Sequence, residues 1–127
     1  MRLRLLTVSL VLAASAATAA YAATSLKTTM KTWKANGAAA ADMVSGRTAF
    51  NEAELRRILE TFINDSKGFE TRIKASTAEA TDLKARFAKL EADSAAALAV
   101  TAQPSQVKGR LSTIFNNCKS CHDVYAN

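Results

Sequence analysis

The residues with the most distinctive chemistry gather at the end of the chain. It closes with NNCKSCHDVYAN, and this stretch contains both cysteines and the only histidine of the 127 residues. The spacing Cys-x-x-Cys-His at Cys118, Cys121 and His122 is typical of haem c attachment. Thiols three positions apart share one face of a helix, where each can bond to one haem vinyl group. We therefore expect one covalent haem c, with His122 as the proximal ligand of its iron.

Other interpretations of this motif have less support. A thioredoxin-like redox pair expects a βαβ setting, and the sequence shows none. A zinc site needs about four ligands, more than two cysteines and one histidine supply. A disulfide between residues so close in sequence would stabilise the fold little. A remote alternative stays open, in which the chain is a haem-free interaction bundle with a bare thiol pair.

The N-terminus has the pattern of an export signal. Arg2 and Arg4 precede an apolar stretch, from Leu5 to about Ala17, that is shorter than the roughly 20 residues needed to span a bilayer. Ala20-Tyr21-Ala22 matches a small-x-small cleavage site. We predict a signal peptide over residues 1–22, one exported domain over residues 23–127, a periplasmic location and no stable membrane anchor. An uncleaved N-terminal anchor is the alternative.

Composition argues against two broad classes of function. The net charge is +6, but the basic residues are scattered and no basic run has interleaved aromatics, so we expect no nucleic-acid partner. The sequence shows no paired carboxylates and no nucleophile beside a base, so we do not expect an enzyme.

The pattern of apolar residues predicts an all-α chain. One proline, four glycines and the absence of long period-two alternation favour helices. We expect four, over about 24–44, 51–68, 76–102 and 105 to the end. Gly46 marks the end of the first helix. Asn51 caps the second, with Phe50 and Leu55 as a hydrophobic staple, and Ser76–Glu79 is a capping box for the third. Pro104 ends the third helix, and Ser105 caps the fourth. Residues 69–75 are either a continuation of the second helix or a loop.

Short connections favour an antiparallel up-down four-helix bundle, with haem near the C-terminal helix. We expect Trp33, Phe50, Phe62 and Phe87 to pack in the core or against the haem.

The order of the helices indicates which residue faces the iron opposite His122. In an up-down bundle the first helix runs antiparallel to the last, so Met30 lies at about the height of His122. Met43 is 13 residues further along, or roughly 20 Å. Met30 is therefore the expected sixth ligand. The alternatives are that Met30 packs over an open iron face or only fills core space.

The chain resembles the class II c-type cytochromes, the family of cytochrome c556 and cytochrome c′. The resemblance rests on the C-terminal motif with Tyr125 three residues after the histidine, and on MKTWKANGAAAADMVSG, which is similar to the family's first helix. Counting back from Gly46 puts Met30 at the family's distal position.

The resemblance implies two functions. One is a c556-like electron carrier with His/Met-ligated iron, which docks transiently with an unidentified redox partner protein. The alternative is a five-coordinate cytochrome c′ that binds nitric oxide or carbon monoxide. A homodimer is also implied by the resemblance.

Overall fold

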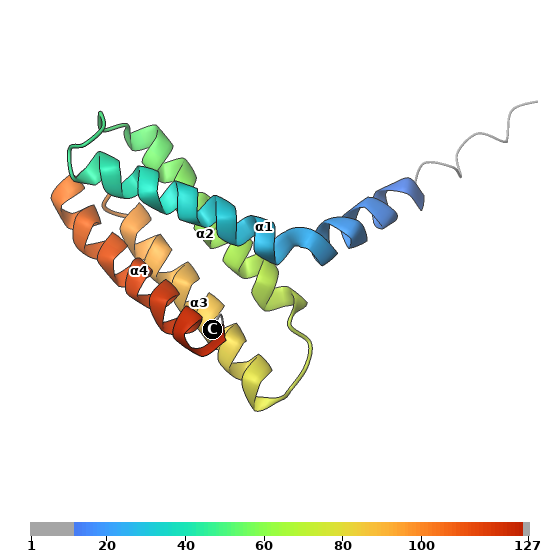
Figure 1. The fold of residues 1–127 in the computed structure, drawn as a ribbon. Coiled ribbons are helices and arrows are strands. Elements are labelled where there is room, and N and C mark those ends of the chain that lie inside the picture. The colour runs from blue at the N-terminus through green and yellow to red at the C-terminus, as the bar shows by residue number, and fades with distance from the viewer. Residues whose placement is uncertain (1–11, 126–127) are drawn as a thin grey trace, which may run out of the picture. The chain divides into compact units, whose positions relative to one another are not determined.

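The structure is a computed structural model that describes residues 12–125, with side chains from Leu26 onward. These residues form four helices, namely α1 (Leu12–Val44), α2 (Glu52–Arg72), α3 (Ala78–Leu98) and α4 (Pro104–Tyr125). The chain divides into two units at Thr32 and Trp33, within α1. In the second unit the last turns of α1 pack with the other three helices (Figure 1). The predicted all-α fold with four packed helices is confirmed.

Side-chain contacts in the second unit show that neighbouring helices run antiparallel. Of the two contacts between each pair of helices, the one that lies further along the first helix lies nearer the start of the second. The pairs are Trp33–Asp65 and Asn36–Arg57 between α1 and α2, Phe69–Phe87 and Lys67–Glu91 between α2 and α3, and Asp82–Tyr125 and Arg86–Ser120 between α3 and α4. Glycine at position 37 brings α1 close to α4, because a Cβ there would lie 3.1 Å from Cε1 of Phe115. The helices are therefore in an up-down arrangement.

The core consists of one apolar stripe from each helix. Its fully buried side chains are Leu55, Ile58 and Leu59 of α2 and Val107, Leu111 and Ile114 of α4. The aromatic residues Trp33, Phe62, Phe69 and Phe87 are also buried, as expected for three of them. Phe50 is 40% exposed, so it is not a core residue, and its packing against the haem stays a prediction. It lies in the loop before α2, outside the amphipathic stripe that the helix periodicity creates.

Two helix ends follow the sequence signals. Gly46 has φ of 79°, and the N–H of Arg47 donates to the carbonyl of Asp42, which is the expected glycine ending of α1. The side chain of Asn51 accepts a hydrogen bond from the N–H of Glu54 at 3.0 Å and caps α2. The Glu54 carboxylate does not complete a reciprocal cap in the way a capping box does, since it binds Arg57 at 2.6 Å.

Other boundaries differ from the prediction. Helix α1 begins at Leu12 and not near residue 24, so residues 12–22 of the expected signal peptide are helical, whereas residues 1–11 lie outside the described part. Helix α2 continues to Arg72 because Phe69 is buried against Trp33 and Phe87.

The bounds of α3 and α4 also differ from the prediction. The cap of α3 is Thr77, whose side chain accepts from the N–H of Ala80, and not Ser76. The helix ends at Leu98, where turns begin, and not near residue 102. Helix α4 starts at Pro104 itself, since proline suits the first helical turn, where its missing N–H costs nothing.

A matched pair of glycine substitutions tests the ending of α1. Gly46→Ala should lower the free energy of unfolding by about 1 kcal/mol, because a Cβ is strained at positive φ. Gly109→Ala, on an exposed face of α4 with open space around it, should raise it by up to about 1 kcal/mol through helix propensity. Urea denaturation measures both. If both substitutions changed the free energy of unfolding in the same direction, the positive φ at Gly46 would be contradicted.

Candidate functional site

The three residues of the C-terminal motif lie together on the second half of α4. Cys118 and Cys121 are both partly buried and form no disulfide. His122 follows directly and is exposed. The two thiols share one side of the helix because three residues make almost one turn. The structure thus brings together two free thiols and one imidazole at one end of the bundle.

Both thiols are in surroundings that favour their protonated form. Burial raises the pKa of Cys118, and the neighbouring Cys121 raises it further. Burial also raises the pKa of Cys121, where Arg86 acts in the opposite direction and Asp82 in the same one. Since an ordinary cysteine pKa is already about 8.5, both residues are thiols at neutral pH.

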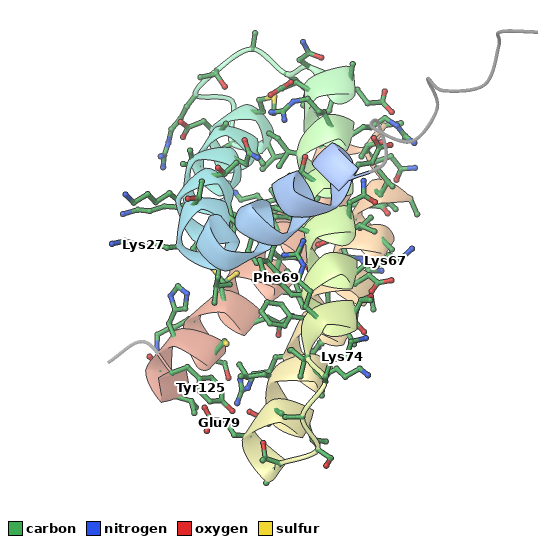
Figure 2. All side chains as sticks on the ribbon, turned by 90° about the vertical axis from the view of Figure 1, so that its right-hand side faces the viewer. Lys27, Lys67, Phe69, Lys74, Glu79 and Tyr125 are labelled. Carbon is green, nitrogen blue, oxygen red and sulfur yellow. The ribbon has the colours of Figure 1, made fainter. Side chains whose placement is uncertain are left out.

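Aromatic rings from three helices lie at the level of the motif. Phe69 contacts Trp33 at 6.0 Å and Phe87 at 5.1 Å between ring centroids. Phe87 is adjacent to Arg86, which donates a hydrogen bond to Ser120, the residue before Cys121. The aromatic cluster of Trp33, Phe69 and Phe87 therefore belongs to the same layer of the bundle as the thiols. Figure 2 shows Phe69 of α2 and Tyr125 of α4 within one view of this end.

A polar cluster joins α3 to the end of α4 in the same layer. Arg86 Nε donates to Asp82 at 2.8 Å, and the Tyr125 hydroxyl donates to the same carboxylate at 2.6 Å. The Arg86 guanidinium also lies 5.8 Å from the centroid of the Tyr125 ring. Sequence reasoning missed this cluster. The spacing of Asp82 and Arg86, four apart on a helix, signalled an ion pair but not its contact with α4.

The residue types at this end are those that haem c attachment requires. Two protonated thiols and an imidazole supply the bonds that haem c requires, and the aromatic cluster supplies apolar surface. Among residues 12–125, no group of three or more His, Cys, Asp or Glu side chains could hold a metal ion.

The two candidate methionines belong to different units of the chain. Met30 is partly buried and lies in the unit that ends at Thr32, which is not positioned relative to the motif. Met43 is buried in the core of the other unit, near the end of α1. The assignment of Met30 as an iron ligand therefore stays a prediction.

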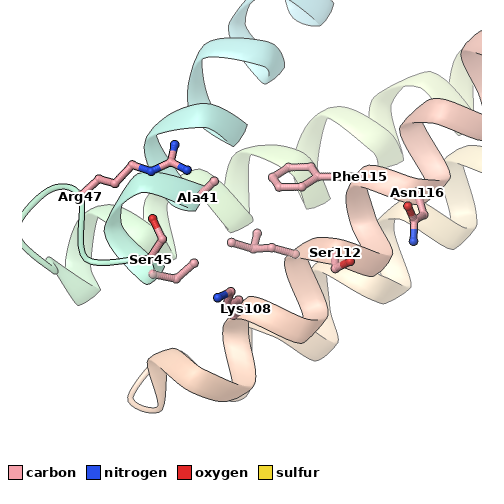
Figure 3. A pocket seen from close by; sticks show the side chains of 9 residues that line it. Ala41, Ser45, Arg47, Lys108, Ser112, Phe115 and Asn116 are labelled. Carbon is pink, nitrogen blue, oxygen red and sulfur yellow. The ribbon is translucent and has the colours of Figure 1, made fainter.

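A separate hollow of about 250 Å³ lies between the end of α1 and the first half of α4 (Figure 3). Its walls include Ala41, Val44, Leu111 and Phe115, with Lys108 at its edge. It contains no thiol, imidazole or carboxylate, and its volume is below the roughly 300–1,000 Å³ of typical ligand pockets. The hollow therefore contains none of the residue types that make up the motif.

Titration of Tyr125 tests the polar cluster. Its hydrogen bond to Asp82 raises the pKa of Tyr125, while the bonds from Arg86 and then Tyr125 lower the pKa of Asp82. The tyrosine contribution to stability is therefore present below about pH 10 and lost as pH rises through the raised pKa. The carboxylate contribution is present above about pH 4 and lost as pH falls through the lowered pKa.

Asp82→Asn should move the pKa of Tyr125 back toward about 10, because the carboxylate that accepts its hydrogen bond is gone. Tyrosinate absorbance measures this pKa, and subtracting the titration of Tyr125→Phe removes the signal of Tyr21. If the Asp82→Asn variant and the wild type gave the same pKa for Tyr125, the two groups would not interact.

No helix among the described residues is long and apolar enough to cross a membrane. Comparison with known proteins finds no matching family model, curated protein or solved structure.

Proposed function

We propose that this chain is an exported c-type cytochrome that transfers electrons in the periplasm, like the c556 members of the class II family. One haem c is bound through Cys118 and Cys121, with His122 and Met30 as iron ligands. The observation that supports this most is the pair of free thiols followed by the only histidine, in the same layer as a cluster of aromatic rings.

The thiols are suited to covalent attachment. Each S–H adds across one vinyl C=C bond, so that an S–C and a C–H bond form and no oxidant or reductant is consumed. Both thiols lie on one helix face and His122 directly follows the second, so these three residues would hold the haem.

The choice of Met30 is supported by helix periodicity. Gly37 and Phe115 face each other across α1 and α4. Met30 precedes Gly37 by seven residues and His122 follows Phe115 by seven, in each case about two helical turns. By this spacing Met30 shares a helix face with Gly37, and His122 shares one with Phe115.

The haem would supply the one-electron chemistry, and His122 and Met30 as iron ligands would raise its reduction potential. The protein's part is to orient the imidazole, to keep six ligands in both oxidation states and to exclude water with Trp33, Phe69 and Phe87. Weak, transient docking then suffices for an unidentified redox partner protein.

Mass spectrometry of the unfolded chain tests attachment. The protein exported by a host with haem-attachment machinery should retain the mass of one haem after denaturation. Cys118→Ala combined with Cys121→Ala should lose it, because no thioether can form. A wild-type chain without added mass would refute the proposal and favour the haem-free thiol pair.

Two methionine variants test the sixth ligand. Met30→Leu should convert a low-spin optical spectrum to a high-spin one that shifts with carbon monoxide, because the iron loses a ligand. Met43→Leu is the matched control, since Met43 is a buried core residue, and its spectrum should stay low-spin. A wild-type spectrum that is already high-spin and shifts with the gas would indicate the five-coordinate cytochrome c′ type instead.

A further inference from the structure

The end of α4 is attached to the bundle mainly by polar contacts. The buried residues of α4 are Val107, Leu111 and Ile114, all before the motif. Among residues 115–125 of the structure none is buried, although Cys118, Cys121 and Tyr125 are partly covered. The last turns of a helix also lack partners for their carbonyl groups and open readily. Apolar packing therefore does little to hold the turn that contains Cys121 and His122.

We propose that Arg86 is a positioning residue that clamps the last turns of α4 to α3, so that Cys121 and His122 are held in a helix before haem is attached. Its value for haem attachment rests on the function proposed above. The clamp itself is a property of the chain without haem.

Arg86 makes the clamp with two different nitrogens. Its Nε donates to Asp82 at 2.8 Å within α3, and its Nη1 donates to Ser120 of α4 at 3.1 Å. Tyr125 closes the arrangement, because its hydroxyl donates to Asp82 while its ring lies beside the guanidinium. The planar fork of arginine places the two donors on separate nitrogens, whereas lysine would have to reach both partners from one nitrogen.

The contacts with α4 lie on either side of the functional residues. Ser120 directly precedes Cys121, and Tyr125 follows His122 by three residues. A further bond from Asn117 to Asp93 ties the preceding turn of α4 to α3. Two hydrogen bonds of the cluster with Arg86 reach the last turns of α4 from α3, one at Ser120 and one at Tyr125.

Amide hydrogen exchange of the full chain without haem tests the clamp. In Arg86→Gln, exchange at residues 120–125 should be about fivefold faster, as expected for the loss of partly exposed charged hydrogen bonds, and exchange at 104–114 should be unchanged. Arg86→Lys should also be faster, because a single nitrogen replaces the separate Nε and Nη1 donors that reach Asp82 and Ser120. Tyr125→Phe removes one bond alone and should give a smaller increase.

Arg57→Gln is the matched control. Arg57 pairs with Glu54 at 2.6 Å, three residues apart on α2, and its hydrogen bond to another helix goes to Asn36 of α1. Its exchange at 120–125 should equal that of the wild type. In the haem-loaded chain, Arg86→Gln should broaden the ferric electron paramagnetic resonance signal through a less fixed imidazole, and Arg57→Gln should not.

Three results would overturn the inference. They are wild-type exchange in Arg86→Gln, wild-type exchange in Arg86→Lys, or an equal increase in all four helices, which indicates general destabilisation. The exchange experiment contains no haem, so a chain that proved unable to attach haem would refute the proposed function and leave this result standing.

Discussion

The contact of Phe69 with both Trp33 and Phe87 determines much of the arrangement. It joins α1, α2 and α3 in one layer, and edge-to-face or tilted ring pairs each contribute about 0.5–1.5 kcal/mol beyond their buried area. The Trp33 indole N–H is satisfied by Asp65 at 2.9 Å, which fixes the ring despite its polar atom. With three helices held by their rings, α4 meets this layer through α3, where its thiols are only partly covered.

This partial coverage has chemical consequences for α4. Complete burial would make the thiols inaccessible, whereas full exposure would give them ordinary acidity. The observed intermediate position raises the pKa of both cysteines and still leaves His122 exposed. The buried residues of α4 lie in its first half, so the helix is anchored at one end and presents its reactive groups at the other.

The sequence predicted the parts of this structure that depend on local signals. Asn51 and Gly46 mark helix ends through their own side chain or backbone, and both were identified correctly. The continuation of α2 through Phe69 was left open because it depends on rings from two other helices. The contact of Arg86 with Ser120 was missed for the same reason, since no local pattern relates residues 34 positions apart. The candidate motif was evident from residue type and spacing alone.

The antiparallel register also restricts how such a bundle can change in length. One residue inserted in α3 between Asp82 and Phe87 would rotate part of the helix by about 100° and separate Arg86 from either Asp82 or Ser120. Seven residues added to α3 alone, or about two turns, would keep its side chains on the same faces. They would also move the residues beyond the insertion along the helix axis, away from their partners on α4. The helices of such a bundle can therefore lengthen most easily by about two turns at once, in adjacent helices together. The loops can vary in length more freely than the helices.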